Sequence, residues 1–299
     1  MQSKLADQIP YKGRFAPSAT GQLHLGSLTV ACACALEAQQ RQGSWLVRID
    51  DLDQLRCSTK SVQHIQSAID ALFPYLTPSH IYRQSEQMER YYQVFDDLVT
   101  QGKVYQCACS RKTIENWPQQ HQHQCRQRVY TSKEHAKTLQ NQPICYRFLS
   151  HLYLKTNEPT TSQELLAQDS VILRKEGFFS YHFACVVDDA ADQISHIIRG
   201  ADLIEAALPQ QYLINELHFD QPQYHYLPLI YNQLGQKLSK QNKAQALDLS
   251  TPEQTLMLGL KHLQWPDYAL QTMPRHDLKA IWQWAQHYWN LSLNSTAIK

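Results

Sequence analysis

The sequence lacks any apolar run approaching the roughly 20 residues that a helix needs to cross a lipid bilayer. Its first residues, Met1-Gln2-Ser3-Lys4, also lack the apolar stretch of a secretory signal. These two absences argue against a membrane partner and predict a cytoplasmic protein.

Charge of either sign is also scarce. Charged residues make up 18% of the chain, and 28 Lys and Arg against 27 Asp and Glu give a formal net charge of +1. Bulk charge therefore does not dictate a nucleic-acid-binding surface, and any such contact must come from a local patch. The 299 residues are 43% hydrophobic, enough for a sizeable core in one large or two modest domains. Nothing requires a dimer, so a monomer is expected.

The N-terminal part carries the pattern of a strand, a helix and a second strand. Residues 11–18 form a strand running into a loop at Pro17, and residues 27–42 contain no Pro or Gly, which favours a helix. Gly43 closes that helix as a C-cap would. Residues 45–50 are β-rich and apolar, as in a buried strand. This order predicts an α/β fold with a Rossmann-like parallel sheet and a ligand crevice at the strand ends.

The rest of the chain alternates between helical and strand-like patterns. We expect helices at 61–76 and 86–100, strands at 186–189 and 196–200, and a helical tail from about residue 251. The tail should be anchored by four tryptophans, Trp265, Trp282, Trp284 and Trp289.

Two short motifs at opposite ends of the α/β pattern indicate a nucleotide site. Gly21 and Gly26 flank His24, so the backbone can approach a ligand closely and the following helix offers free N–H groups. By itself this motif is more often a surface turn with a helix cap. Far downstream, Lys237 and Lys240 follow a glycine turn, where an ammonium can reach phosphates, although a solvated basic turn is common. Together the motifs predict a split ATP site.

The two motifs together resemble the signature of class I aminoacyl-tRNA synthetases. The surrounding blocks are closer to the glutamyl subgroup: Gly13–Ser18, Leu46–Asp53, Val187–Asp189, Ile198–Leu203 and Lys237–Asn242. A full glutamyl-tRNA synthetase continues into a helical region that reads the anticodon, whereas this sequence stops at Lys299. It therefore resembles the shorter glutamyl-Q tRNA(Asp) synthetases.

The resemblance implies a residue set for each substrate. For ATP, which enters with Mg²⁺, it implies Pro17, His24, Gly26, Ser27, Lys237, Ser239 and Lys240, with His24 and Lys240 as the catalytic pair. For L-glutamate it implies Arg14, Phe15, Ala16, Pro17, Ser18, Asp50, Tyr181 and Arg199. Arginine suits a carboxylate, and an acid suits the ammonium. The family usually has Glu where this chain has Asp50. From the residues alone, each arginine is equally explained by a structural ion pair.

The implied reaction activates glutamate to glutamyl-adenylate without tRNA and then transfers it to the queuosine base in the anticodon of tRNA(Asp). One alternative is a truncated glutamyl-tRNA synthetase that charges the tRNA 3′ end. Another is a nucleotidyltransferase, which shares the first motif but not the blocks around Arg14 and Arg199. A third is a catalytically silent tRNA-binding paralogue, against which His24 and Lys240 argue.

A cysteine cluster predicts a metal. Cys107, Cys109 and Cys125 lie within nineteen residues, and zinc takes four N or S ligands in a tetrahedron. His121 and His123 can each supply the fourth donor. The resembling family uses Cys-x-Cys, a Tyr and a final Cys, and His121 stands at the Tyr position, which favours it. A loop with free thiols is the alternative. One structural zinc per chain is expected.

The resemblance also divides the chain into four parts. These are the first half of the catalytic domain at 1–100, a zinc-bearing, acceptor-binding-like insertion at 101–168, the second half at 169–235, and the second lysine motif with a helical part at 236–299.

Overall fold

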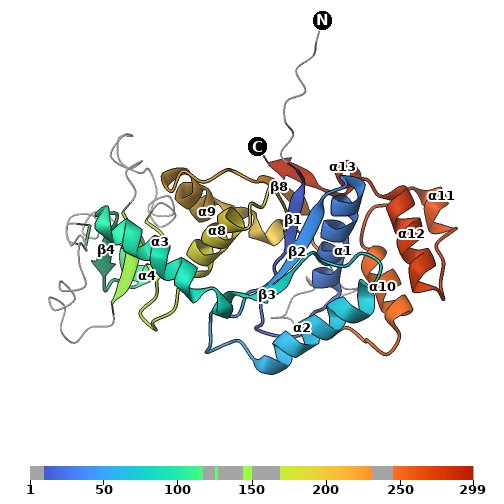
Figure 1. The fold of residues 1–299 in the computed structure, drawn as a ribbon, viewed down its shortest axis with the longest axis horizontal. Coiled ribbons are helices and arrows are strands. Elements are labelled where there is room, and N and C mark those ends of the chain that lie inside the picture. The colour runs from blue at the N-terminus through green and yellow to red at the C-terminus, as the bar shows by residue number, and fades with distance from the viewer. Residues whose placement is uncertain (1–9, 117–124, 127–143, 150–168, 231–244, 299) are drawn as a thin grey trace, which may run out of the picture. The chain divides into compact units, whose positions relative to one another are not determined.

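The computed structural model describes residues 10–116, 125–126, 144–149, 169–230 and 245–298. They fall into two compact units (Figure 1). Unit 1 comprises Met1–Gln84, Gln193–Ile204 and Pro222–Lys299, and unit 2 comprises Ser85–Asp192 and Glu205–Gln221. The four-part division expected from the sequence stays a prediction.

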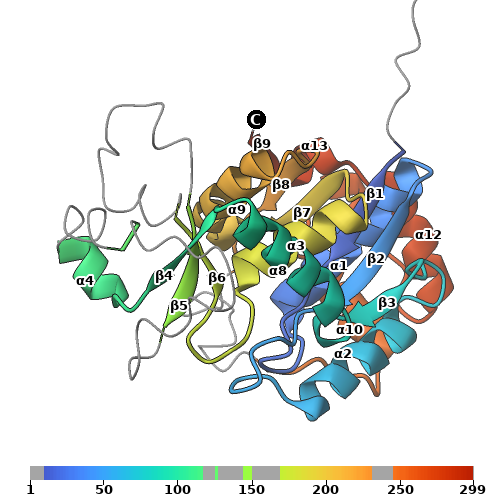
Figure 2. The ribbon, with the colours of Figure 1, turned by 60° about the vertical axis from the view of Figure 1, so that its left-hand side comes forward.

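Unit 1 is built on a six-stranded sheet in the order β3-β2-β1-β7-β8-β9 (Figure 2). The first five strands in this order run parallel and β9 is antiparallel to β8. The strands are β1 (Lys12–Phe15), β2 (Ser44–Ile49), β3 (Ile81–Arg83), β7 (His196–Gly200), β8 (Gln223–Leu227) and β9 (Thr296–Ile298). The predicted α/β fold with a parallel sheet is thus confirmed.

One face of this sheet packs on α1 and the C-terminal helices around the main hydrophobic core. The helices in the described part of unit 1 are α1 (Leu25–Gln40), α2 (Thr59–Leu72), α10 (Pro252–Leu260), α11 (Asp267–Leu270), α12 (Leu278–Tyr288) and α13 (Leu291–Asn294), with a short 3-10 turn at Ala201–Leu203. A second 3-10 turn, Gln84–Glu86, spans the boundary with unit 2. No helix of the described chain is long and apolar enough to cross a membrane.

The tryptophans of the tail are buried anchors, as expected. Each buries its ring and donates its indole N–H to an internal acceptor, which removes the cost of burying that polar group. Trp282 donates to the Leu72 carbonyl at 2.8 Å and Trp289 to the Glu37 carboxylate at 2.8 Å. These bonds tie the C-terminal helices to α2 and α1.

The end of α1 differs from the expectation in one respect. Gln42, not Gly43, has the left-handed backbone (φ 53°) that terminates the helix, and Gly43 N–H returns to the Ala38 carbonyl at 2.9 Å. Gly43 is needed for a different reason. A Cβ at Gly43 would lie 2.2 Å from the Tyr11 carbonyl oxygen, so only glycine lets the two backbones approach this closely.

Unit 2 contains a three-stranded antiparallel sheet and helices with an aromatic cluster. Its elements are α3 (Met88–Thr100), β4 (Val104–Cys107), α4 (Arg111–Asn116), β5 (Cys145–Phe148), β6 (Val171–Leu173), α8 (Tyr181–Ala191) and α9 (Ile204–Glu216). The sheet order is β4-β5-β6. The ring of Phe179 lies 5.4–6.0 Å from those of Tyr91, Phe95 and Phe183.

The strand predicted at residues 186–189 is wrong, because these residues lie inside α8. Ser180 caps that helix through its side chain, which accepts the Phe183 N–H at 3.3 Å. Asp188 then points into unit 2, where Tyr91 and Arg90 donate to its carboxylate at 2.8 and 3.0 Å. The cap and these tertiary contacts outweigh the β-propensity of the two valines.

Replacing Gly43 with Ala is expected to lower the free energy of unfolding by about 1–3 kcal/mol, because its Cβ would meet the rigid backbone of Tyr11. Urea unfolding followed by circular dichroism measures the change. Gln42→Gly is the matched control, and it should be neutral or stabilising since glycine removes the left-handed strain at φ 53°. A Gly43→Ala protein as stable as the native one would contradict this account.

Candidate functional site

The loop after β1 is held to the end of β2 by backbone hydrogen bonds. Asp50 N–H donates to the Pro17 carbonyl and Ala19 N–H donates to the Asp50 carbonyl, both at 2.9 Å. Ser18 and Asp50 thus pair as a parallel bridge beyond the ends of the two strands. The ladder places both residues at the carboxyl edge of the sheet, where open α/β sheets bind ligands.

Three buried arginines lie on one face of this sheet. Residues paired directly across neighbouring strands share a face, and Arg14 pairs with Leu46, Arg48 with Tyr82 and Arg199 with Tyr226. These partners all belong to a small apolar cluster distinct from the main core. The arginines are 0–4% exposed. Buried guanidinium groups on a shared face, near the strand ends, form a setting suited to carboxylate binding.

The neighbour of Arg14 on the opposite face behaves differently. Phe15 packs in the main hydrophobic core and is 4% exposed. Any contact of Phe15 with a ligand on the arginine face must therefore come from its backbone. Ala16 and Ser18 are half-buried, and Pro17 is buried.

Asp50 has a charged neighbour that the sequence reasoning missed. Arg48 Nε donates to Asp50 Oδ1 at 2.9 Å, and the two side chains are 0% and 6% exposed. The contact fixes the orientation of the carboxylate. One feature of the sequence could have revealed this pair: two opposite charges stand two residues apart at a buried strand, a spacing that puts their side chains on the same face.

Arg199 is also positioned by residues that the sequence reasoning missed. Its Nη2 donates to the Tyr226 hydroxyl at 2.9 Å. Its guanidinium carbon lies 4.7 Å from the ring centroid of Tyr224 and 5.2 Å from that of Tyr226. These contacts restrict the arginine through cation–π attraction and one hydrogen bond. Both tyrosines come from β8, so only the strand pairing reveals them.

The sheet reverses its order at β1. The chain leaves β1 towards β2 on one side and later adds β7 on the other. Gly13 pairs with His196, so β1 and β7 run in parallel and their carboxyl ends meet the same edge. Such a reversal opens a crevice between two connections, and Arg14 and Arg199 lie on the two strands that flank it.

His24 is the N-cap of α1. Its Nδ1 accepts the Ser27 N–H at 3.4 Å, and its Nε2 lies 3.3 Å from the Ser27 hydroxyl. The helix starts at Leu25, so Gly26 and Ser27 lie in its first turn, whose N–H groups favour anions. Leu247 N–H donates to the Leu23 carbonyl at 3.0 Å. Lys237, Ser239 and Lys240 lie outside the described residues.

Tyr181 belongs to unit 2. It is the first residue of α8, is 39% exposed, and its ring lies 5.4 Å from that of His182. The contacts within unit 1 bring together Ser18 and Asp50 and place Arg14 and Arg199 on neighbouring strands, while Tyr181 is described separately.

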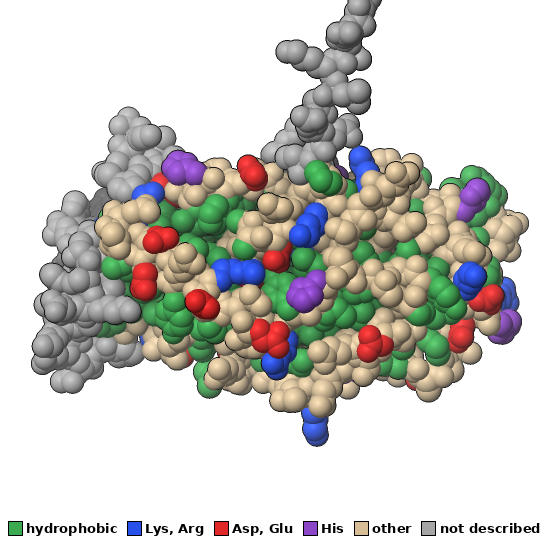
Figure 3. Space-filling view, viewed as in Figure 1, with side chains coloured by type: hydrophobic (Ala, Val, Ile, Leu, Met, Phe, Trp, Pro, Cys, Tyr) green, Lys and Arg blue, Asp and Glu red, His purple; other side chains and the backbone are tan. Residues whose placement is uncertain are grey.

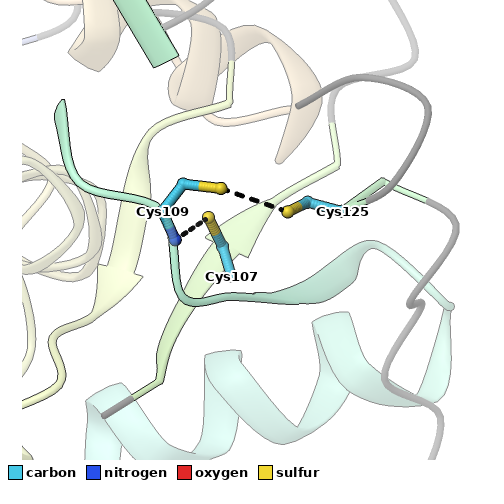
Figure 4. A group of neighbouring side chains, drawn as sticks. All are labelled: Cys107, Cys109 and Cys125. Carbon is cyan, nitrogen blue, oxygen red and sulfur yellow. Dashed lines mark hydrogen bonds between the residues drawn. The ribbon is translucent and has the colours of Figure 1, made fainter. Parts of the chain in front are cut away.

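The predicted cysteine cluster is present in unit 2 (Figure 4). Cys107, Cys109 and Cys125 place their sulfur atoms within 4.8 Å of one another, and Cys109 Sγ lies 3.4 Å from Cys125 Sγ. Hydrogen bonding to Cys107 and burial raise the pKa of the Cys125 thiol, and burial raises that of Cys109. Three cysteine sulfur atoms this close together could hold a metal ion. His121 lies outside the described residues.

Comparison with known proteins gives a consistent family assignment. Residues 11–277 match the catalytic domain of class I tRNA synthetases (E and Q). The chain is 36% identical to a glutamyl-Q tRNA(Asp) synthetase from Pectobacterium atrosepticum over 95% of this chain and 86% of that protein. It is 37% identical to a namesake from Acinetobacter baylyi over 92% of each.

The fold of a glutamate tRNA ligase from Elizabethkingia meningosepticum, solved with its amino acid, is also similar. The TM-score is 0.67 at 20% identity, over 96% of this chain and 66% of that longer one. At this identity the likeness concerns the fold. The family model and the relatives together show that the chain belongs to the glutamyl-Q tRNA(Asp) synthetases, a family of class I aminoacyl-tRNA synthetase ligases.

Proposed function

We propose that this protein activates L-glutamate with ATP in the absence of tRNA and then attaches it to the queuosine base in the anticodon of tRNA(Asp). The observation that carries the proposal is the backbone bridge between Ser18 and Asp50, with buried arginines on the same sheet face at the carboxyl edge. The relatives named for this activity, from Pectobacterium atrosepticum and Acinetobacter baylyi, support it.

The amino acid is recognised by opposite charges at its two ends. Arg14 and Arg199 bind the carboxylates, because guanidinium groups match carboxylate geometry. Asp50 binds the ammonium, and Arg48 holds the Asp50 carboxylate in place through the 2.9 Å contact. The proposed glutamate site also includes Ser18 and the backbone of Phe15, Ala16 and Pro17, from the end of β1 and the loop that follows. Tyr181 contributes a hydroxyl.

Activation joins glutamate to the nucleotide. A carboxylate oxygen of glutamate attacks the α-phosphorus of ATP, the bond to the bridging oxygen breaks, and pyrophosphate leaves with its electron pair. Pro17, His24, Gly26 and Ser27 cradle the nucleotide at the start of α1. Lys237, Ser239 and Lys240 close over the phosphates, and His24 and Lys240 stabilise the developing charge. ATP brings Mg²⁺ with it.

The residues on either side of the second lysine motif support its proposed role in binding ATP. Ile230 follows β8 shortly after that strand ends at the carboxyl edge, and Leu247 is bonded to Leu23 beside His24. Lys237 and Lys240 lie between these two points in the sequence.

Transfer then consumes the adenylate. A hydroxyl of queuosine attacks the glutamyl carbonyl, an ester bond forms, and AMP leaves; the hydroxyl proton passes to solvent or phosphate. Basic and acidic side chains are interspersed on the face of the described chain drawn in Figure 3. With a net charge of +1, the tRNA must be held by local contacts. We expect a cytoplasmic monomer.

A structural zinc ion completes the proposal. Cys107, Cys109 and Cys125 would hold it in unit 2. For the fourth position, the family resemblance favours His121 over His123. The ion crosslinks a segment with a small apolar core and takes no part in the two chemical steps.

Glutamate-dependent exchange of radioactive pyrophosphate into ATP is expected without any tRNA, because activation precedes transfer. Aspartate, one methylene shorter, is the control amino acid. Exchange that requires tRNA would contradict tRNA-independent activation, and no exchange with or without tRNA would identify a silent tRNA-binding protein.

The acceptor is tested by nucleoside analysis of tRNA(Asp) incubated with enzyme, ATP and labelled glutamate. The label is expected on the queuosine nucleoside, and tRNA(Asp) carrying guanosine at that position should take up none. Label on the 3′-terminal adenosine would overturn the proposed acceptor in favour of ordinary tRNA charging.

Asp50→Asn is expected to raise the KM for glutamate by about 10–100-fold, since it removes the charge that faces the ammonium. Glutarate, which lacks the amino group, separates this role from general damage. Inhibition by glutarate should change little in Asp50→Asn, while Asp50→Glu, the residue usual in the family, should keep glutamate activity. Equal losses for glutamate and glutarate would show that Asp50 does not face the ammonium.

A further inference from the structure

A fourth thiol lies at the cysteine cluster. In the β4–β5 ladder, Cys107 pairs directly with Cys145. Side chains of directly paired residues on antiparallel strands project from the same face, with Cβ atoms about 4.5–5.5 Å apart. The strand pairing therefore brings a cysteine 38 residues downstream of Cys107 to the predicted metal site.

The contacts around Cys107 bear this out. The Cys107 sulfur lies within 4.8 Å of the Cys125 sulfur, and Cys107 is paired directly with Cys145 in the ladder. The Cys145 Sγ also donates to the Cys107 carbonyl at 3.2 Å. Cys145 and Cys109 are half-buried and pack against the same small cluster that contains Cys107 and Cys125. Cys107 is thus the shared neighbour of the other two thiols.

We propose that Cys145 is the fourth ligand of this metal site, so that zinc is held by four thiolates from Cys107, Cys109, Cys125 and Cys145. The inference rests on the proposed zinc site and replaces the fourth ligand that the sequence assigns to His121.

Three of the four sulfur atoms already lie at distances near those of a zinc site. Zinc–sulfur bonds of about 2.3 Å in a tetrahedron put neighbouring sulfur atoms about 3.8 Å apart. Cys109 and Cys125 are already 3.4 Å apart, and the three sulfur atoms of the first group lie within 4.8 Å. Cys145 lies outside this group of three sulfur atoms, so its thiol must turn from the Cys107 carbonyl towards them when the metal binds.

The charges around the site are compatible with a fully thiolate shell. Zinc with four thiolates carries a net charge of −2, which a buried site tolerates only beside positive groups. Arg147 lies two residues from Cys145 on β5, so on the same face of the strand, and is 6% exposed. Arg126, next to Cys125, is engaged with the Asp169 carboxylate at 2.8 and 2.9 Å. Arg147 is therefore the cation that faces the thiolates.

Rigidity gives a further reason. Cys107 and Cys145 are fixed to each other by the β4–β5 ladder, which continues through the pairs Gln106–Tyr146, Tyr105–Arg147 and Val104–Phe148. Two ligands on paired strands are preorganised, so less conformational entropy is lost when the metal binds.

X-ray absorption at the zinc edge of the purified full-length protein tests the ligand set without relying on enzymatic activity. The native protein is expected to show four sulfur neighbours at about 2.3 Å and no nitrogen at about 2.0–2.1 Å. Cys145→Ser should show three sulfurs and one oxygen or nitrogen. Competition with a chromophoric chelator should show that Cys145→Ser binds zinc more than about 100-fold more weakly than the native protein. Losing a residue that only hydrogen-bonds a ligand costs about 10–100-fold in affinity, so a larger loss indicates a direct ligand.

Controls separate the ligand from its neighbours. His121→Asn and His123→Asn should keep the four-sulfur shell, as should Cys57→Ser, which makes the same change at a half-buried thiol in unit 1. Three sulfurs and one nitrogen in the native protein would overturn the role of Cys145 while leaving the zinc site standing. Failure of the native protein to hold zinc would overturn both. Glutamate-dependent exchange in the same samples shows whether the enzymatic proposal fails separately.

Discussion

The candidate active site depends on two backbone hydrogen bonds that join the loop after β1 to Asp50. They extend the β1–β2 pairing past the strand ends, so Ser18 lies beside Asp50. The same loop then leads to His24, where α1 begins. A single ladder therefore sets the positions of the loop, the buried carboxylate and the helix N-terminus. Under the proposed function, this edge of the sheet holds both an amino acid and a nucleotide. The two hydrogen bonds keep the residues for these substrates in fixed relative positions, which matters because the substrates must react with each other.

The two faces of the sheet divide the tasks of stability and binding. Alternation along β1 and β2 sends Phe15, Val47 and Ile49 into the main core, and Arg14 and Arg48 to the other face. Burying Arg48 and Asp50 as an ion pair is a poor way to gain stability, since well-packed apolar residues often do as well or better. Under the proposed function their burial has a purpose, because a carboxylate fixed in place before the substrate arrives binds an ammonium with little reorganisation.

The sequence predicted what local patterns specify. The order of β1, α1 and β2, the strand at 196–200 and the anchoring tryptophans followed from periodicity and from glycine and proline positions. It failed where distant contacts decide. The Val186–Asp189 run is helical because Ser180 caps the helix and Asp188 binds Tyr91. Likewise, Tyr226 reaches Arg199 only through the pairing of β7 with β8, which no single-sequence pattern encodes. The grouping of Tyr181, Lys237 and Lys240 with these residues stays a prediction.

The cysteines illustrate the same limit, and their surroundings show what the proposed metal would add to unit 2. Cys107, Cys109 and Cys125 are recognisable by spacing, whereas Cys145 joins them only once β4 and β5 pair. Around them, the apolar cluster of the described residues contains just Tyr105 and Ile114 besides cysteines at its buried centre. This cluster buries little apolar surface and contributes only a few kcal/mol at about 25 cal/mol per Å². A metal bound by Cys107 on β4 and by Cys109 and Cys125 further along the chain would join these segments. Its binding free energy would then stabilise a region whose apolar cluster is small. If a second strand also contributes a ligand, the metal stabilises the strand pairing itself, and the ladder in turn holds those two ligands ready for it.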